Sequence, residues 1–204
     1  GEAGGDVQTV VQKPYYAVYG WMPAAGTDPA LVPGPATIWQ VESGDTLAPG
    51  KPVTLRWDNG AGQVFRRTYE LDDKFLFTVT QMLENKGTAP FSAAPYGILA
   101  RHGKPDTQNF FVLHEGVVGM TDGTLLEEKY KDLPELTPLA GEGPAQLLEV
   151  KENGWIGFTD KYWMTTLAPA PGQSFTAVVK YAPGADIYQT ETRMPLFFND
   201  PAAT

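Results

Sequence analysis

Residues Asn153–Pro169, which read NGWIGFTDKYWMTTLAP, form the most informative stretch of this 204-residue chain. Aromatic and aliphatic side chains fill it between a glycine turn and a proline stop. It is too apolar for a surface loop and is typical of extended chain in the middle of a sheet. Bulky side chains fall on both faces of such a strand, because successive side chains alternate. We therefore predict that 155–167 is the central strand of the core.

This prediction makes two statements about individual residues. Trp155 and most of Phe158–Leu167 are expected to be buried, so that Trp155→Ala is expected to cost about 3–5 kcal/mol. Gly154 and Gly157 are expected where two backbones approach closely or a bulge forms, because a strand tolerates glycine only at such places.

The clearest local pattern lies earlier in the chain. In Val53–Asp58 apolar and polar side chains alternate, Asn59-Gly60 follows, and Val64–Leu71 returns. Asn-Gly between alternating segments predicts a hairpin, here with a loop longer than two residues. A third strand over Phe75–Glu84 follows the polar pair Asp72-Asp73, so these segments predict an antiparallel meander.

The rest of the chain consists of short apolar segments separated by Gly and Pro, with a long surface loop at 23–36. No segment shows helical periodicity over more than about two turns, against a base rate near one third. The acidic segment 127–139 is expected to be a loop with at most one helical turn. We therefore predict an all-β chain. Its remaining strands are predicted at Tyr15–Met22, Thr37–Val41, Tyr96–Ala100, Phe110–His114, Val117–Met120, Thr124–Glu127, Gln146–Val150, Phe175–Tyr181 and Ile187–Thr192.

Composition favours one soluble domain spanning 1–204. A hydrophobic content of 42% supplies a sizeable core, and 22 Gly with 18 Pro favour a sandwich or barrel. The net charge of −9 argues against nucleic acid and against an anionic membrane surface as electrostatic partners. The absence of Cys excludes disulfides, thiol nucleophiles and thiolate metal sites. No apolar segment reaches the ~18 residues of a spanning helix, and no signal peptide opens the chain.

The histidines are the first candidates for chemistry. His102 and His114 lie twelve positions apart, and Glu115 follows the second. Two imidazoles with a carboxylate could serve acid–base catalysis or bind a metal ion. Neither spacing matches a helical or hairpin ligand motif, so a structural role is the stronger interpretation.

Other candidate groups fit structural roles equally well. Two pairs of adjacent carboxylates cannot act together, because adjacent residues in a strand point to opposite sides. Three serines lack the Gly-x-Ser-x-Gly elbow of a nucleophilic serine. One Gly-x-Gly sequence belongs to a hairpin and not to a phosphate-binding loop. We predict no catalytic, cofactor-binding or metal-binding residue, and no cofactor; partner-binding residues stay unknown. The groups considered are Asp72-Asp73, Glu127-Glu128, Ser43, Ser92, Ser174 and Gly60-Ala61-Gly62.

Four segments of the chain stand out together as sequence motifs. The first three are Lys13–Pro23, the meander from Tyr69 to Gly87, and His114–Leu133. The fourth is Gly154-Trp155, Asp160-Lys161-Tyr162-Trp163 and Leu167-Ala168-Pro169. In this order they resemble the large periplasmic domain of the YidC family of bacterial membrane-protein insertases, and the first is similar to its α-proteobacterial branch. Together they span about 13–195, and the tail 196–204 falls outside the resemblance.

The resemblance implies a fold: a β-supersandwich of two antiparallel sheets, similar to galactose mutarotase. It also implies a fragment of a larger membrane protein on the periplasmic side of the bacterial inner membrane, attached through segments absent from this chain. No functional residue of the insertase carries over, because its polar groove lies in the membrane bundle.

The function implied by the resemblance is binding rather than catalysis. The expected partners are the Sec translocon accessory subunits SecD and SecF and inserting membrane proteins, not nucleic acid. The alternative is a carbohydrate-binding or aldose-epimerase-like domain, suggested by analogy of fold alone. Such an enzyme needs a general acid and base in one cleft. Convergence of His102, His114 and a carboxylate would favour it.

Overall fold

The computed structural model describes residues 14–105 and 114–200. These residues form β-strands, two 3₁₀ turns and loops, and they contain no α-helix. Within the same residues, no helix has the length and apolar character needed to cross a membrane. The described strand pairs with a resolved register are antiparallel. The prediction of an all-β sandwich is confirmed.

The chain divides into two compact units, and the single-domain organisation stays a prediction. Unit 1 comprises 1–18 and 98–192, and unit 2 comprises 19–97 and 193–204. Strands β1 (Tyr15–Pro23) and β6 (Phe91–His102) each contribute residues to both units. They belong to a seven-stranded sheet ordered β1-β6-β14-β13-β10-β9, in which β15 (Phe197–Asn199) also pairs with β6.

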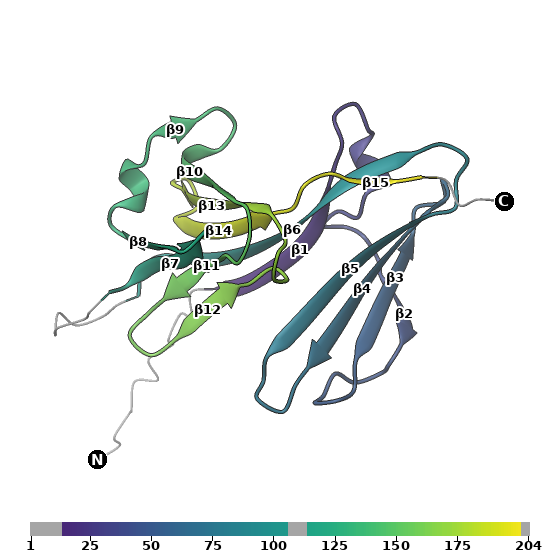
Figure 1. Cartoon of the computed structure of the whole chain (residues 1–204), viewed down its shortest axis with the longest axis horizontal. Coiled ribbons are helices and arrows are strands. Elements are labelled where there is room, and N and C mark those ends of the chain that lie inside the picture. Colours follow the sequence, from purple (N-terminus) through teal and green to yellow (C-terminus); the bar gives the residue numbers. More distant parts are fainter. Residues whose placement is uncertain (1–13, 106–113, 201–204) are drawn as a thin grey trace, which may run out of the picture. The chain divides into compact units, whose positions relative to one another are not determined.

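Unit 1 contains a four-stranded sheet, β12-β11-β7-β8, and the strands β9, β10, β13 and β14 (Figure 1). Phe158 of β11 stacks on Tyr130 at 5.6 Å between ring centroids, and Tyr130 meets Tyr188 of β14 edge-on at 5.0 Å. These aromatic rings join the two layers of a sandwich. The bounds are β7 Gly116–Thr121, β8 Thr124–Lys129, η2 Leu133–Glu135, β9 Pro138–Leu139, β10 Gly143–Val150, β11 Trp155–Thr159, β12 Met164–Leu167, β13 Phe175–Ala182 and β14 Ile187–Arg193.

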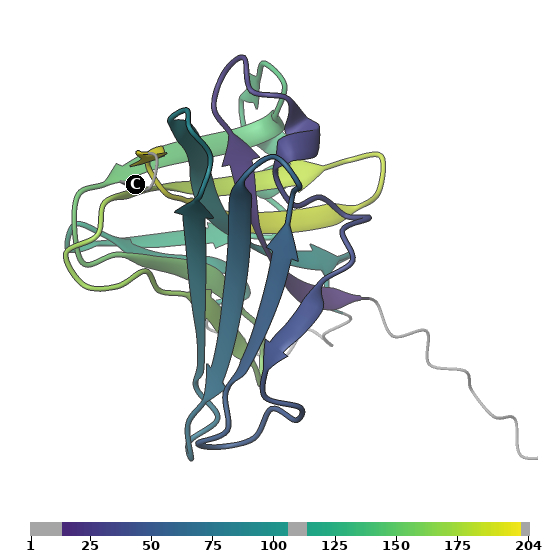
Figure 2. The ribbon, with the colours of Figure 1, turned by 90° about the vertical axis from the view of Figure 1, so that its right-hand side faces the viewer.

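Unit 2 is built on the four-stranded sheet β2-β3-β4-β5 (Figure 2). Alternation sends Phe65 to the inner face, where it lies fully buried against Trp21 and Phe91, with ring centroids 5.2 and 6.2 Å away. Its cross-strand neighbours Trp57 and Leu83 pack on the same cluster. The bounds are η1 Pro29–Leu31, β2 Gln40–Ser43, β3 Val53–Asp58, β4 Gln63–Leu71 and β5 Phe77–Asn85.

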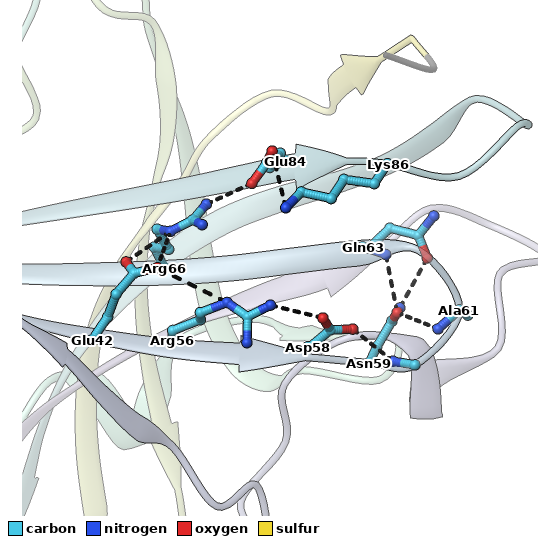
Figure 3. Close-up of polar contacts among 10 residues, drawn as sticks. Glu42, Arg56, Asp58, Asn59, Ala61, Gln63, Arg66, Glu84 and Lys86 are labelled. Carbon is cyan, nitrogen blue, oxygen red and sulfur yellow. Dashed lines mark hydrogen bonds and ion pairs between the residues drawn. The ribbon is translucent and has the colours of Figure 1, made fainter. Parts of the chain in front are cut away.

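The Asn59-Gly60 hairpin forms as predicted, with four residues, 59–62, between β3 and β4. The Asn59 side chain organises this loop: its Oδ1 accepts from the amides of Ala61 at 2.8 Å and Gln63 at 3.1 Å. Its Nδ2 donates to Gln63 Oε1 at 2.9 Å (Figure 3). The Asn59 side chain therefore supplies hydrogen-bond partners to the loop amides in place of backbone carbonyls.

Several strand boundaries differ from the predictions. β2 lies at Gln40–Ser43 rather than Thr37–Val41, and β6 is twice as long as Tyr96–Ala100 suggested. Of the predicted strand Phe110–His114, residues 110–113 lie outside the described residues, and His114 belongs to no strand. Phe75 and Leu76 precede β5 and are exposed, because the chain is still turning there.

The largest correction concerns 155–167, which is a hairpin and not one central strand. β11 and β12 pair in antiparallel register, with Ile156 opposite Leu167 and Thr159 opposite Met164. Of the residues expected to be buried, Phe158 and Leu167 are buried, but 161–164 are exposed and Trp155 is only half-buried. The cause is the charged pair Asp160-Lys161, at which the chain reverses. The cost expected for Trp155→Ala falls accordingly below that of a core tryptophan.

Candidate functional site

The turn of the β11–β12 hairpin presents three large side chains to solvent. Tyr162, Trp163 and Met164 are 80, 75 and 56% exposed. The amide of Asp160 donates to the carbonyl of Trp163 at 2.7 Å and closes the turn. Lys161 Nζ lies 5.2 Å from the centroid of the Tyr162 ring, within cation–π range. Folding therefore leaves three consecutive large side chains in water, two of them aromatic, and such a group marks an interaction site more often than an isolated exposed residue does. We call residues 160–164 the aromatic turn.

Asp160 fixes the base of the aromatic turn to the body of unit 1. One carboxylate oxygen lies 2.7 Å from Arg101 Nη1, and the other accepts a hydrogen bond from the Tyr130 hydroxyl at 2.9 Å. The side chains of Asp160 and Arg101 are only 11 and 15% exposed. The Arg101 guanidinium also lies between two rings, 5.5 Å from Tyr15 and 5.6 Å from Tyr130. Both oxygens of the carboxylate are thus engaged by groups that are themselves held by packing.

A second contact restrains the following residue. The amide of Lys161 donates to Glu115 Oε1 at 3.2 Å, so the loop before β7 also holds the aromatic turn. Two successive residues of the turn are therefore fixed before the exposed side chains begin. Such restraint lowers the entropy lost when a partner binds.

Burial sets the protonation behaviour of this cluster. Desolvation raises the pKa of Asp160, against the opposing effects of the Tyr130 hydrogen bond and the Arg101 charge. Desolvation and the neighbouring Asp160 raise the pKa of Tyr130. Tyr130 therefore stays a neutral hydrogen-bond donor and does not act as a base.

β12 is an edge strand. Its order in the sheet, β12-β11-β7-β8, gives it one strand neighbour within the described part of the chain. An edge strand offers backbone donors and acceptors to an added strand of another chain. β12 begins at Met164, the last residue of the aromatic turn, so the turn leads directly into the edge strand; we call residues 160–167 the β12 edge (Figure 1).

Gly157 explains how β12 can lie so close to β11. A Cβ atom built at Gly157 would lie 2.0 Å from the carbonyl oxygen of Thr165 across the pair. At Gly154 the same atom would lie 2.9 Å from the carbonyl oxygen of Met120. The predicted close backbone approach at both glycines is therefore confirmed.

The histidine candidates make separate structural contacts. His102, at the end of β6, lies 3.4 Å through Nε2 from the Tyr16 hydroxyl, and His114 Nε2 donates to the Val117 carbonyl at 2.8 Å. Glu115 contacts the aromatic turn. No group of three or more His, Asp or Glu side chains in the described residues could hold a metal ion.

The other groups considered also lie in structural positions. Asp72 shapes the turn before β5, Glu127 and Glu128 lie in β8, and 60–62 belong to the β3–β4 loop. Ser43 ends β2, Ser92 lies in β6 and Ser174 precedes β13. Arg101, by contrast, went unnoticed in the sequence, because its significance depends on a partner 59 positions later.

The outer face of β2–β5 carries charged side chains that form ion pairs with one another. Arg66 lies 2.8 Å from both Glu42 and Glu84, and Arg56 lies 2.8 Å from Asp58 (Figure 3). Strand alternation brings these groups to one side of the sheet. A surface of internally paired charges is typical of a solvated face, so it is a weaker candidate for binding than the β12 edge.

Unit 2 also has an open groove of about 500 Å³ beneath η1. Its lining contains no ionisable side chain, so it offers no acid–base chemistry. The lining residues are Pro29, Ala30, Val32, Gly34, Pro35, Ala36, Thr37, Ile38 and Trp57.

The fold defines a class: a β-sandwich domain, here with an edge strand that follows an exposed aromatic turn. Sequence comparison specifies the family. Residues 7–204 match the family model described as the YidC periplasmic domain, and the chain belongs to that family. The match includes the tail 196–204, which the resemblance noted above did not reach.

Relatives with high identity are known. The chain is 84% identical over 201 residues to "Membrane protein insertase YidC" of Paracoccus denitrificans, covering 98% of this chain and 32% of that protein. The proteins of the same name from Jannaschia sp. and Dinoroseobacter shibae are each 58% identical. These two alignments cover 94 and 89% of this chain, and 31 and 30% of the relatives. The chain thus spans about a third of the length of these relatives, and the family that it belongs to is a periplasmic domain.

Proposed function

We propose that this domain is a non-enzymatic binding module that contacts SecD and SecF, and also inserting membrane proteins, through the β12 edge. The observation that carries the proposal is the aromatic turn: exposed side chains on a restrained turn that continues into an open strand edge. Each of these features supports binding of another polypeptide.

The aromatic turn supplies side chains suited to the centre of an interface. Tryptophan and tyrosine are enriched among residues that dominate binding energy, because they bury a large area at a small entropic cost. Trp163 and Tyr162 are 75 and 80% exposed, so their area is available to a partner. The contacts of Asp160 with Arg101 and Tyr130 fix the base of the turn that carries these two rings.

The β12 edge supplies the backbone component. An extended partner segment can pair with Met164–Leu167 as an added strand, and backbone hydrogen bonds then give affinity with little demand on partner sequence. This tolerance suits a domain that meets different membrane proteins. Contacts of a transient machine are expected in the micromolar range or weaker, about −8 kcal/mol or less favourable.

The enzymatic alternative draws no support from the geometry. His102 contacts Tyr16 and His114 contacts the backbone of Val117, so each imidazole has a separate structural partner. The analogy with carbohydrate enzymes therefore rests on fold alone.

Site-specific crosslinking tests the proposal in the intact insertase. A photoreactive amino acid at position 163 in membranes is expected to capture SecD, SecF or a nascent membrane protein. The same group at position 58, on the charged face of β3, is the matched control and is expected to capture less. Equal capture at both positions would contradict the assignment to the β12 edge.

Titration of this chain with periplasmic segments of SecD and SecF gives the affinity. Trp163→Ser is expected to weaken binding about tenfold or more, and Ile38→Ser, at another exposed apolar residue, to leave it unchanged. Because the chain carries a net charge of −9, binding to a basic segment should weaken as salt rises. Sugar binding, or anomer interconversion abolished by His114→Ala, would overturn the proposal in favour of an enzyme.

A further inference from the structure

The end of the β4–β5 hairpin carries three consecutive apolar side chains that the core does not use. Phe75, Leu76 and Phe77 are 73, 66 and 57% exposed. We call residues 72–77 the Phe-Leu-Phe tip. Three consecutive large apolar residues in water are unlike the scattered exposed residues found on most surfaces.

Most amides of the tip are hydrogen-bonded within the turn. Asp72 Oδ1 accepts from the amides of Lys74 and Leu76, each at 2.8 Å. The amide of Asp72 donates to the Leu76 carbonyl at 3.1 Å, and the amide of Phe75 donates to the Asp72 carbonyl at 3.2 Å. Four amides of this short turn therefore need no hydrogen bond from water or from a partner.

Phe75 adopts a backbone conformation that is unfavourable for phenylalanine. Its φ is 62°, in the left-handed region where a bulky side chain is an outlier and glycine or asparagine is preferred. Strain of this kind persists where the side chain serves a purpose. Here it places a phenyl ring in solvent, where packing within the chain gains nothing from it.

We infer that the Phe-Leu-Phe tip is a membrane-contact element that inserts its three side chains into the surface of a zwitterionic lipid bilayer. Two observations favour lipid over a polypeptide. A backbone entering lipid must satisfy its polar groups internally, as the amides of Asp72, Lys74, Phe75 and Leu76 do, whereas a strand-like partner site would leave its amides open. The family places this domain beside the inner membrane, so a bilayer is within its surroundings.

The charges near the tip determine which lipid it favours. The β2–β3 connection lies at the same end of the sheet, because the amide of Gly50 donates to the Leu71 carbonyl at 3.1 Å (Figure 2). Together Asp45, Asp72 and Asp73 outnumber Lys51 and Lys74. Lys74 can extend its ammonium toward a lipid phosphate, but the net acidic charge disfavours an anionic surface. Phosphatidylcholine or phosphatidylethanolamine is therefore the expected lipid.

The absence of cysteine makes a site-specific test straightforward. Leu76→Cys provides a single attachment point for an environment-sensitive fluorophore. The labelled chain is held on phosphatidylcholine vesicles by an N-terminal tag on a long Gly/Ser linker, which supplies a millimolar effective lipid concentration. Insertion is expected to shift the emission to the blue, and nitroxide-bearing lipids are expected to quench it.

Variants separate insertion from general adhesion. Replacing both Phe75 and Phe77 by Ser in the labelled chain is expected to reduce the inserted fraction about tenfold or more. The reason is that each variant side chain lacks the favourable free energy of moving a phenyl ring from water into lipid. Ile38→Ser, at an exposed apolar residue outside both the tip and the β12 edge, is the control and is expected to leave insertion unchanged. Vesicles containing phosphatidylglycerol are expected to give less insertion than phosphatidylcholine alone. Thermal melting of each variant checks that it is folded.

Two results would overturn the inference. One is a fluorophore at position 76 that stays in water on tethered vesicles while the chain is folded. The other is an emission shift seen only when a soluble apolar peptide is added and never with vesicles, which would assign the tip to polypeptide binding. Neither result bears on crosslinking at position 163, so this inference and the proposed function fail separately.

Discussion

The aromatic turn of β11–β12 and the Phe-Leu-Phe tip of β4–β5 both expose large apolar side chains, but they are held by different means. Side chains distant in sequence hold the first, through the buried pair of Asp160 and Arg101. Its neighbours in the chain hold the second, through hydrogen bonds to Asp72. The conformation of residues 160–164 therefore depends on the tertiary fold, whereas the conformation of residues 72–77 depends on the local sequence.

The difference also concerns the chemistry that each end offers. Tyr162 and Trp163 combine an apolar ring with a polar group and continue into an open strand edge, which suits a polypeptide partner. The side chains of Phe75, Leu76 and Phe77 carry no polar group, and four amides of their turn are already hydrogen-bonded within it, which suits lipid. The lesson is that exposed apolar surface must be interpreted together with the state of its backbone.

Replacing the aspartate that holds each turn is expected to give the largest difference in stability between the two regions. Asp160→Ala is expected to destabilise the chain by about 3–5 kcal/mol, because it leaves the buried Arg101 charge without its partner. Asp72→Ala is expected to cost about 1 kcal/mol, since the freed amides can bond to water. Urea denaturation measures both. Equal costs would refute the distinction between tertiary and local support.

A methyl group added within the β11–β12 pair should have the next largest effect. Gly157→Ala is expected to cost about 1–3 kcal/mol, because its Cβ would lie 2.0 Å from the Thr165 carbonyl oxygen and would force the strands apart. Gly184→Ala is the matched control, because nothing lies within 4 Å of the atom added there. Thermal denaturation should show a loss for the first variant only. A stable Gly157→Ala variant would mean that β12 tolerates a wider separation.

Relief of strain at the Phe-Leu-Phe tip should have the opposite sign. Phe75→Asn is expected to stabilise the chain by about 1 kcal/mol, because asparagine tolerates the left-handed conformation that Phe75 adopts at φ 62°. The measurement is again the denaturation midpoint, with Phe77→Asn as the control outside that conformation. A loss of stability in Phe75→Asn would show that the ring packs favourably after all.

The pH dependence of stability should differ in sign between Asp160 and Glu84, with the smallest effects. Burial raises the pKa of Asp160, so its contribution is full below the ordinary value of 3.8 and is lost as pH rises through the folded pKa. Hydrogen bonding to Arg66 lowers the pKa of Glu84, so its contribution is present above 4.5 and is lost as pH falls through the folded pKa. Stability profiles of Asp160→Asn and Glu84→Gln from pH 3 to 7, each compared with the parent chain, measure these opposite slopes. Slopes of the same sign would contradict the assignment.

Local patterns in the sequence were sufficient for much of unit 2. Alternation over Val53–Asp58 and Val64–Leu71, with Asn59-Gly60 between them, correctly predicted a hairpin and its longer loop. Hairpin register depends on neighbouring residues, so it can be inferred from a short window. The same reasoning placed Phe75 and Leu76 in a strand, because apolar character does not reveal whether a segment has already left its turn.

The sequence by itself determined that this chain is all-β, that Gly154 and Gly157 lie at close backbone approaches, and which family it resembles. Alternation, turn residues and motif order are properties of short segments, so they need no knowledge of distant contacts. Only the tertiary structure decided that 155–167 is a hairpin and that Asp160 is buried on Arg101 while Trp163 is exposed. Those outcomes depend on which distant side chains meet, and an apolar residue has the same identity whether it fills a core or faces a partner.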